Sequence, residues 1–431
     1  MRKMYLFALI FSAFFLVIPF FSMFLVSINA YTSWNAPIRI TFDDYDDYQV
    51  VITHQDFGKV IHIAWVKEID GITTREIFYA NSTNWDNHIR ITNDSMHDFN
   101  PMIDVDCCGT VHIVWVKEVA PENSDIFYTN STDWSYHVNV SRKEPSSHNY
   151  LPTLAKEYFG STVHIAWTAG ADIDSTDIYY RKNVDGKLQK VVNTPDSPSI
   201  QPSITLDKYL GVHLVWVELG AAGDWDIWYT NSSSWPCTIS TDKNQVSDVC
   251  QIDNGIDDLR PDISVDNNNI SHVTWYGTKT GTYIYYSFNP LNTFFLTPWQ
   301  VSNTTGDINP SIVLGVNTNP VIIYEGGGLP TEINCIDYNG SWAPLPISFN
   351  LLTDNLELAS IGALDIDLED NLYAAYSTNT TDDFEIYVVD GMITTPGGIP
   401  GFNGAIVLLV FLGSLVVWQF YRKKSIKTLP N

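Results

Sequence analysis

The stretch VHIVWVKEVAPENSDIFYTNSTDW, residues 111–134, recurs with variations along this chain of 431 residues. In each copy an apolar run ends on an aromatic residue, a polar loop follows, and a second short apolar run leads into a turn. The copies are 49 to 59 residues apart, because the aromatic that ends the first run is Trp65, Trp115, Trp167, Trp216, Trp275, Tyr324 and Tyr376. A nearly fixed period of this length indicates repeated supersecondary units.

Each unit is predicted to contain four short strands. In the copy around Trp115 the first covers 101–106, the second 111–115 and the third 125–128, and the fourth starts near Trp134. β-Branched and aromatic residues dominate these runs and turn residues separate them, which is typical of strands. Four strands in a repeat of about 50 residues is the pattern of a propeller blade. The sequence therefore predicts an all-β fold, a seven-bladed β-propeller of four-stranded blades over residues 31–390.

The seventh unit ends after its third strand, at 385–389, and has no fourth strand of its own. Residues 33–41, SWNAPIRIT, match residues 84–92, NWDNHIRIT, which form the predicted fourth strand of the first unit. We therefore expect the N-terminal strand to complete the last blade. This closure would hide two sheet edges that would otherwise stay open.

The recurring pattern D-x-x-G-x-V-H-I-V-W followed by D-I-Y-Y resembles the sialidase-like, BNR-repeat group of propellers over about residues 31–390. Sialidase activity in that family needs three arginines that hold the substrate carboxylate, and its repeats carry an Asp-box, which is missing here. Only Arg75 and Arg260 are expected on outward loops among the six arginines between the chain ends, which are Arg39, Arg75, Arg90, Arg142, Arg181 and Arg260. The resemblance therefore implies the fold without its catalytic residues.

Both ends of the chain are hydrophobic. Residues 1–30 are predicted to be a signal peptide or an N-terminal anchor, because Arg2 and Lys3 precede a long apolar run. At the other end we expect a linker at 391–402, a transmembrane helix at 403–421 and a basic cytoplasmic tail at 422–431. The Pro400-Gly401-Phe402 triplet before this helix resembles the PGF-type anchoring signals of archaeal surface proteins. These segments predict a cell-surface protein that is anchored in the membrane with the propeller outside.

Charge and composition agree with an exterior location. The chain has a net charge of −26, and six of its 23 basic residues lie in the two ends. The middle therefore carries 17 basic against 49 acidic residues, a net charge of −32, which excludes nucleic acid as a partner. A disulfide is predicted between Cys237 and Cys250. The adjacent Cys107 and Cys108 could form a strained vicinal disulfide. Nine sequons predict glycosylation sites at Asn81, Asn93, Asn130, Asn139, Asn231, Asn269, Asn303, Asn339 and Asn379.

Blade geometry separates two faces of the predicted propeller. Loops between the fourth and first strands, and between the second and third, lie on one face, which we call the loop face. The shorter turns lie on the other, the turn face, where both chain ends leave toward the membrane. The loop face is thus expected to look outward, and its candidate ligand-binding residues are His97, Asp98, His148, Asp172, Asp174, Asp224, Trp225, Asp258 and Arg260. An exposed Trp225 could stack on a sugar, although packing on a neighbouring ring is the alternative.

Metal and cofactor sites are weakly indicated. One histidine in each of five second strands, at 62, 112, 164, 213 and 272, cannot converge on one ion, because the blades radiate from an axis. We expect these histidines to form structural hydrogen bonds between blades. No cofactor is required and no metal site is predicted. The loop acids could bind Ca²⁺, but they lack a compact EF-hand-like spacing, so solvated loop acids are the favoured interpretation.

Three functions remain open from the sequence. The first is a non-enzymatic binding or adhesion module for an extracellular glycan or protein, which the missing arginine triad favours. The second is a glycoside-active enzyme that uses two loop carboxylates. The third is a structural component of the cell envelope. A flat loop face without a pocket would count against the first two functions and favour the third.

Overall fold

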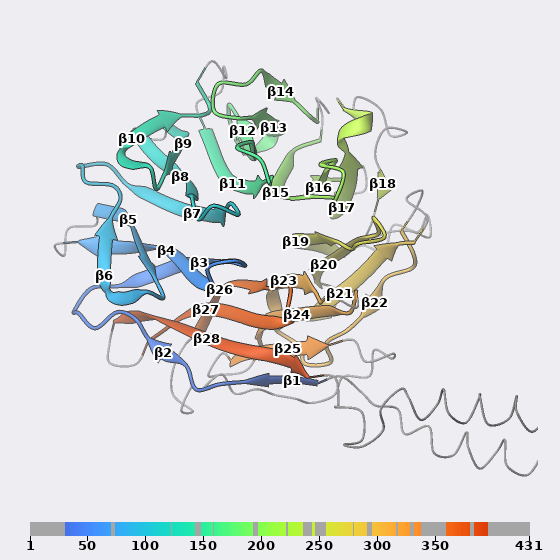
Figure 1. The fold of residues 1–431 in the computed structure, drawn as a ribbon. Helices are drawn as coiled ribbons and strands as arrows, with labels where there is room; N and C mark the ends of the chain where they lie inside the picture. The colour runs from blue at the N-terminus through green and yellow to red at the C-terminus, as the bar shows by residue number, and fades with distance from the viewer. Residues whose placement is uncertain are drawn as a thin grey trace, which may run out of the picture. The chain divides into compact units, whose positions relative to one another are not determined.

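The predicted strands are present in a computed structural model of the chain (Figure 1). The structure describes residues 31–69, 74–121, 123–142, 148–157, 159–192, 197–220, 223–235, 244–245, 256–278, 280–290, 295–315, 318–327, 332–337, 359–379 and 383–394. Within this part of the chain the regular elements are β-strands and two short 3₁₀ turns, η1 (Ile173–Ser175) and η2 (Ser232–Ser234). The prediction of an all-β fold is confirmed.

The strands pair antiparallel in the order of the chain, in groups of three to five. The second and third groups share one eight-stranded sheet, joined through a single parallel pair between Ser124 and His148. The groups in the first half of the chain are β3 (Asp47–Gln55), β4 (Val60–Ile69), β5 (Thr74–Asn81) and β6 (Asn84–Arg90); β7 (Asp98–Val105), β8 (Val111–Ala120), β9 (Asn123–Asn130) and β10 (Asp133–Asn139); and β11 (His148–Lys156), β12 (Val163–Gly170), β13 (Asp177–Lys182) and β14 (Leu188–Lys190).

The second half repeats this arrangement. The last group is special because it combines C-terminal strands with the two N-terminal strands, β1 (Tyr31–Trp34) and β2 (Ile38–Arg39). The remaining strands are β15 (Ser199–Leu206), β16 (Val212–Leu219), β17 (Trp225–Asn231) and β18 (Asn244–Gln245); β19 (Asp257–Val265), β20 (Ser271–Thr278), β21 (Thr282–Asn289) and β22 (Trp299–Gln300); β23 (Ile308–Leu314), β24 (Pro320–Gly326) and β25 (Glu332–Asp337); and β26 (Ala359–Ile366), β27 (Asn371–Asn379) and β28 (Phe384–Thr394).

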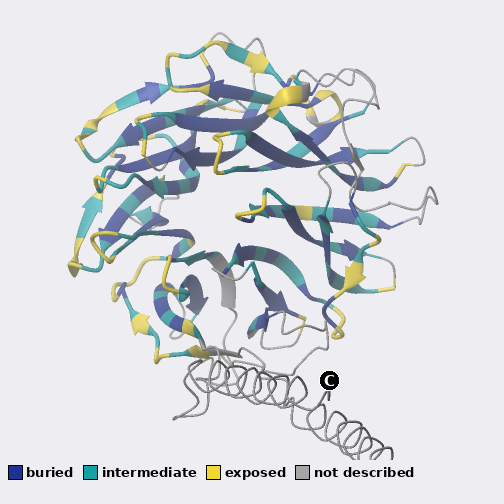
Figure 2. Cartoon of the chain, turned by 45° about the vertical axis from the view of Figure 1, so that its right-hand side comes forward, coloured by how far each residue is buried: buried dark blue, intermediate teal, exposed yellow. Residues whose placement is uncertain are grey.

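The second strand of each group is the centre of its sheet and is buried on both faces (Figure 2). Its aromatic residue is among the most buried side chains of the domain, as at Trp115 and Trp216, which are fully inaccessible. A strand that neighbouring sheets cover on both sides loses the alternation of polar and apolar residues. This is why the repeated run Val-His-Ile-Val-Trp is almost continuously apolar.

Apolar clusters hold neighbouring sheets together around the domain. One cluster joins Tyr79 of the first group to Trp115 of the second, and the next joins Tyr128 to Trp167. The series continues to a cluster that joins β28 of the last group to β3 and β4 of the first, through Val388, Ile52 and Trp65. The last sheet therefore packs against the first, as a propeller requires.

The second-strand histidines bind tyrosines of the third strand in the same sheet. In each of five groups the histidine Nδ1 lies 2.7 Å from a tyrosine hydroxyl, as in the pairs His62–Tyr79 and His112–Tyr128. The predicted structural hydrogen bond is confirmed, but its shared partner is a tyrosine of the adjacent third strand in the same group. The expected bond between neighbouring groups is present at His213, whose Nδ1 also lies 3.0 Å from Ser271 Oγ. Burial lowers the pKa of His62, His112 and His272 to about 4, so these rings are neutral near pH 7.

The N-terminal strands complete the last sheet, as predicted. Ile38 of β2 pairs with Val388 of β28, and Arg39 pairs with Tyr387. The Arg39 guanidinium donates to Thr41 O and to the buried carboxylate of Glu385 at 2.6 Å. The backbone N–H of Ile386 donates to Thr41 Oγ1 at 2.9 Å. We call Arg39, Thr41 and Glu385 the closing contacts.

The first sheet contains the same three contacts at equivalent positions. The Arg90 guanidinium donates to Thr92 O and to Glu76 Oε1, and the backbone N–H of Ile77 donates to Thr92 Oγ1. The repeated Arg-Ile-Thr phrase therefore marks one structural device that fastens the fourth strand to the third. The arginine and the glutamate are 14 residues apart in the first sheet and 346 residues apart in the last sheet.

The predicted terminal segments lie outside the described residues. This applies to the signal peptide or anchor at 1–30, most of the linker at 391–402, the transmembrane helix at 403–421 with its PGF-type triplet, and the tail at 422–431. Among the residues that the structure describes, no helix has the length and apolarity needed to cross a membrane. Residues 32–393 form one compact unit by themselves.

The junction between the last and the first sheet contains a histidine between two carboxylates. His54 Nδ1 lies 2.9 Å from Asp365 Oδ2, and His54 Nε2 lies 2.8 Å from Asp56 Oδ1. Burial alone would lower the pKa of His54, but the hydrogen bonds and charges of Asp365 and Asp56 outweigh it and raise the pKa to about 9. The protonated ring therefore stabilises this junction.

We expect the free energy of unfolding to fall as the pH rises from 6.5 through 9. A histidine whose folded-state pKa is raised contributes stability that is fully present below 6.5 and is lost as the pH passes its folded value. The loss is on the order of 2–3 kcal/mol for this group. Denaturant unfolding at several pH values checks it. His54→Gln should flatten the profile in this window, whereas His62→Gln should leave its slope unchanged, since His62 titrates near 4. Equal slopes in the wild type and His54→Gln would contradict the assignment.

Candidate binding cavity

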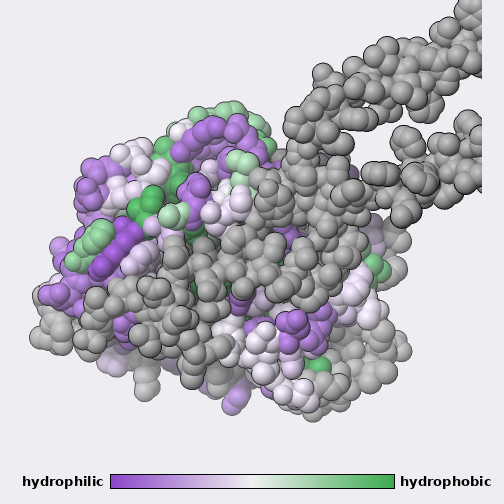
Figure 3. All heavy atoms as spheres, turned by 90° about the horizontal axis from the view of Figure 1, so that it is seen from below, coloured by the Kyte–Doolittle hydropathy of each residue, from purple (hydrophilic) through white to green (hydrophobic). Residues whose placement is uncertain are grey.

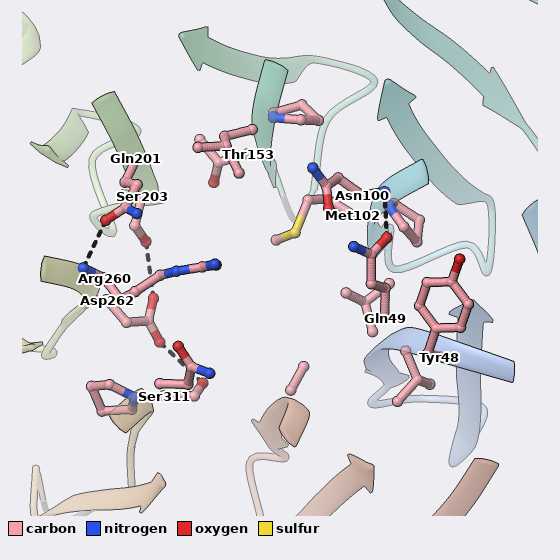
Figure 4. Close-up of a pocket in the computed structure, with 18 of the residues that line it drawn as sticks. Tyr48, Gln49, Asn100, Met102, Thr153, Gln201, Ser203, Arg260, Asp262 and Ser311 are labelled. Carbon is pink, nitrogen blue, oxygen red and sulfur yellow. Dashed lines mark hydrogen bonds between the residues drawn. The ribbon is translucent and has the colours of Figure 1, made fainter. Parts of the chain in front are cut away.

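The first strands of the sheets surround a cavity of about 680 Å³ (Figure 4). Its lining comes from β3, β7, β11, β15, β19 and β23, with Ala363 of β26, Ser377 of β27 and Phe384 of β28. These residues lie near the starts of first strands and at the junction of β27 with β28, which is the loop-face end of the sheets. Most of the described lining is neutral, and its charged side chains are Asp46, Arg260 and Asp262.

A bulge in each first strand shapes this lining. The antiparallel register shifts at the same place in every group, for example between Phe99 and Met102 and between Leu259 and Asp262. The first residue of each of these two bulges, Asn100 or Arg260, has a φ of about +50°, which side chains other than glycine rarely adopt. The same conformation recurs at the cavity-lining residues Gln49, Asn100, Leu151, Gln201, Arg260 and Asn309. We call these six residues the bulge ring.

Side-chain amides of the bulge ring bind the backbone of the next sheet. Gln49 Oε1 accepts a hydrogen bond from Asn100 N at 2.9 Å, and Gln201 Oε1 accepts one from Arg260 N at 2.8 Å. These bonds fix the backbone at Asn100 and Arg260, so side chains of the preceding sheet stabilise the strained φ values. The Asn100 and Arg260 side chains are thereby presented to the cavity.

Arg260 is the one cation in the described lining. Its side chain extends from β19 toward the interior of the cavity (Figure 4). No hydrogen bond or ion pair joins its guanidinium to another residue of the described part of the chain, and its surface is exposed. A guanidinium in this position offers a planar set of donors to a carboxylate or a sulfate.

Asp262 supports the wall beside Arg260. Its carboxylate accepts hydrogen bonds from Ser203 Oγ of β15 at 2.9 Å and from Ser311 Oγ of β23 at 3.0 Å. It also accepts from the backbone N–H groups of Ile263 and Ile312. Burial raises the pKa of Asp262, and these hydrogen bonds offset only part of that effect. Asp262 therefore ties three neighbouring first strands together and has no oxygen left over for a ligand.

The structure places most of the predicted ligand-binding residues elsewhere. Of the nine, only Arg260 lines the cavity. Asp98 and Asp258 are buried, and the expectation that they face outward is wrong. Each accepts a hydrogen bond from a second-strand indole, at 2.7 Å from Trp115 Nε1 to Asp98 and at 2.9 Å from Trp275 Nε1 to Asp258.

This bond between a first-strand acid or amide and an indole recurs. Trp65 Nε1 donates to Asp47 at 2.6 Å and Trp167 Nε1 donates to Asn149 at 3.0 Å. Burial raises the pKa of Asp47 to about 7, although Lys67 and the indole lower it in part. These acids belong to the structural core of the sheets, so they are not candidates for ligand binding.

The other predicted residues are distributed over separate loops. Asp224 is buried beneath a tight turn at Gly223, and Trp225 is half-buried against the cluster around Trp275, so the alternative of packing is the one observed. Asp172 caps η1 by accepting from Asp174 N, and both acids are exposed. His97 and His148 are half-buried at the starts of β7 and β11, outside the cavity lining.

Several predicted sequon asparagines have structural roles. Asn81 and Asn130 donate to the hydroxyls of Tyr79 and Tyr128 and accept from the backbone two residues later, which closes the turn between the third and fourth strands. Asn139 donates to Asp125 at 2.8 Å, and Asn231 caps η2. Asn93 and Asn303 are exposed, Asn269 and Asn379 are half-buried, and Asn339 lies outside the described residues.

The described residues contain neither a disulfide nor a cluster of metal ligands. Cys107 and Cys108 are free thiols with their sulfurs 3.7 Å apart, so the vicinal disulfide is not formed. Cys237 and Cys250 lie outside the described residues. Among the described side chains no three histidine, cysteine or acidic groups come together around a position for a metal ion.

Comparisons with known proteins identify a fold and no family. No family model matches the chain, and no curated protein matches it. Solved structures do match: an ulvan lyase of a polysaccharide lyase family has a TM-score of 0.56 at 10% identity, over 84% of this chain and 95% of that one. A Penicillium chrysogenum alpha-L-arabinanase has a TM-score of 0.47 at 12% identity, over 71% and 98%.

The solved structures that match the chain also include a sialidase. A sialidase mutant from Trypanosoma rangeli matches with a TM-score of 0.43 at 9% identity, over 83% of this chain and 58% of that one. A score of this size carries no argument about a site. Together with the sheet order, the neighbours show that the described domain has a propeller-like all-β fold.

Proposed function

We propose that the chain is a membrane-anchored, seven-bladed propeller on the cell surface whose central cavity binds an anionic glycan. Seven blades are supported by the sheet order, because the shared eight-stranded sheet divides into two groups of four strands. They are also supported by the apolar clusters, which join each group to the next and the last to the first. Apolar runs at both chain ends support the anchor.

The observation that carries the binding proposal is the Arg260 guanidinium inside the cavity (Figure 4). A volume of about 680 Å³ falls in the range of small-ligand pockets and suits a few sugar units better than a protein surface. The rest of the lining supplies amides at Asn100 and Gln201 and a tyrosine ring at Tyr48. Such groups bind hydroxyls and the faces of sugar rings, and the arginine adds a requirement for negative charge.

The negative charge of the domain opposes an anionic ligand, so Arg260 must supply the attraction locally. A domain with a net charge of −32 repels anions at long range, so an anionic ligand must be held by local contacts. The ulvan lyase neighbour has been solved bound to -[GlcA(1-4)Rha3S]-, which carries acidic groups. That likeness concerns the fold and transfers no residue. It makes acidic oligosaccharides a reasonable first set of probes.

The carboxylates of the cavity lining already accept hydrogen bonds from the protein, which favours a binding function over glycoside hydrolysis. A glycosidase of the usual type needs two available carboxyl groups on either side of the bond that breaks. The described lining contains Asp46 and Asp262, and both oxygens of Asp262 already accept hydrogen bonds. Asp46 Oδ1 accepts from Phe384 N at 2.9 Å. This lining suits recognition of a glycan better than cleavage.

We expect Arg260→Gln to weaken binding of acidic oligosaccharides by about 10-fold or more, since a hydrogen bond to a charged group contributes about 1.5–3 kcal/mol. Isothermal titration of the purified full-length chain with uronate-bearing and neutral oligosaccharides, with and without Ca²⁺, measures this. Arg75→Gln is the matched control, because Arg75 is also exposed at this end of the sheets but pairs with Glu68 outside the cavity. Equal losses in both variants, or tight binding of neutral sugars alone, would contradict the proposal.

A further inference from the structure

Turns between first and second strands carry large exposed apolar residues in four of the sheets. These residues are Phe57 at 72%, Phe159 at 82%, Tyr209 at 75% and Leu368 at 68% exposure. We call them the apolar tips. Single exposed apolar residues are common on soluble proteins and need no explanation. Here the same turn of the repeat carries one in several sheets, so all four lie on the turn face, at the other end of the sheets from the residues that line the cavity.

Hydrogen bonds fix the turns that carry Tyr209 and Leu368, and further contacts join the turns of Leu368 and Phe57. Asp207 accepts from Tyr209 N at 2.7 Å and from Gly211 N at 2.8 Å, and Asp367 closes the turn at Leu368 in the same way. Leu368 N donates to Asp56 beside Phe57 at 3.3 Å. Lys59 and Glu369 form an ion pair between the same two turns. The apolar side chains are thus displayed by rigid backbone, at exposures that cost hydration free energy in water.

Both ends of the described domain leave it on this face. At the C-terminal end, Ile393 N donates to Asp370 O in the turn that carries Leu368. The N-terminal strand lies beside the same strand end, since Asn35 N donates to Asp390 O at 2.8 Å. The apolar run 404–421 begins about ten residues after Thr394, a span of at most about 35 Å. The apolar run 4–28 ends close to Tyr31.

We propose that the apolar tips rest in the interface of the lipid bilayer to which the chain is anchored. This inference rests on the proposed membrane anchoring and adds a contact surface to it. Aromatic and aliphatic side chains favour the boundary between headgroups and acyl chains. Contact at several turns would hold the propeller with its cavity directed away from the membrane. The anchors then serve as tethers, and the tips set the orientation of the domain.

Quenching by brominated lipids tests this contact in the full-length chain. The protein is reconstituted into phosphatidylcholine vesicles with plain or brominated acyl chains, and Phe57→Trp and Tyr209→Trp are compared with the wild type. Bromine quenches only indoles that reach the bilayer. Phe42→Trp is the matched control, because Phe42 is 68% exposed but follows the closing strand on the loop-face side. We expect a loss of emission from the indoles introduced at positions 57 and 209 and none at position 42.

Trp418 separates failure of this inference from failure of the anchoring. It lies inside the apolar run 404–421, so its quenching, identified by comparison with Trp418→Phe, reports insertion of that run. Quenched Trp418 with unquenched indoles at positions 57 and 209 overturns the tip contact and leaves the anchor intact. Unquenched Trp418 overturns the anchoring itself. Protection of positions 57 and 209 from aqueous acrylamide without bromine quenching also overturns the bilayer contact, because another part of the protein then covers the tips.

Discussion

A chain that lacks residues 31–41 is expected to lose the cooperative unfolding of the whole domain. The deletion removes β1, β2 and the buried residues Ile40 and Thr41, and it uncovers the outer edge of β28. It also removes the apolar contacts of Trp34 with the cluster of the last sheet. An open edge and an incomplete last sheet leave both neighbouring clusters partly exposed. Near-UV circular dichroism with increasing denaturant should show a broad transition at much lower concentration than in the wild type.

Point variants of the closing contacts give a graded version of this result. Arg39→Ala leaves the buried Glu385 carboxylate without its cation and is expected to cost about 3 kcal/mol, the lower part of the range for breaking a buried pair, because Arg39 is itself partly exposed. Arg90→Ala breaks the same contact within the first sheet, between β6 and β5. We expect both variants to lose a similar free energy of unfolding, but only Arg39→Ala to unfold less cooperatively. That result would show that the contact between β2 and β28 stabilises all the sheets and not the last one alone. A deletion variant that unfolds like the wild type would contradict the closure.

The largest effect of a single substitution in the cavity wall is expected for Asp262→Ala. This change leaves four donors from three strands without their acceptor, and each buried unsatisfied group costs about 1–3 kcal/mol. We expect a total loss of about 4 kcal/mol in the free energy of unfolding, since such costs are not fully additive. Asp262→Asn keeps the shape and one carbonyl oxygen, but its NH2 group then faces either the Ile263 or the Ile312 N–H, so it should recover only part of this loss.

Asp104→Ala is the matched control for this wall. Asp104 also lies in a first strand and is half-buried like Asp262, but among the described residues it accepts hydrogen bonds only from the backbone N–H groups of Val105 and Lys156. Its loss should therefore cost less than that of Asp262. Denaturant unfolding at pH 7 compares the three variants. An Asp262→Ala protein no less stable than Asp172→Ala, whose acid is exposed on a loop, would contradict the role assigned to the wall.

The sequence predicted the scaffold well because the scaffold repeats. The apolar second strands follow from burial on both faces, and the match between residues 33–41 and 84–92 identified the closing strand through the shared Arg-Ile-Thr phrase. The repeat also contains a second regular spacing. Asp47, Asp98, Asn149 and Asp258 stand 17 or 18 residues before the tryptophan that each of them binds. That spacing distinguishes a core acid from a loop acid.

The cavity could be predicted only in part. Arg260 was placed on the correct face by its position before the first strand, yet its neighbours in the lining were missed. The bulge ring places Asn100, Leu151, Gln201, Arg260 and Asn309 directly before prolines with φ near +50°. Residues before proline normally adopt extended conformations, so no local rule predicts this geometry. It is imposed by the neighbouring strands, through contacts such as Gln201 Oε1 with Arg260 N.

The separation of 346 residues between Arg39 and Glu385 has a consequence for how the chain is made. A ribosome that adds about 5–20 residues per second needs roughly 20–70 s to pass from one partner to the other. During that time β2 has no strand to pair with, and the earlier sheets can form without it. Completion of the last sheet is therefore a late, post-synthetic step.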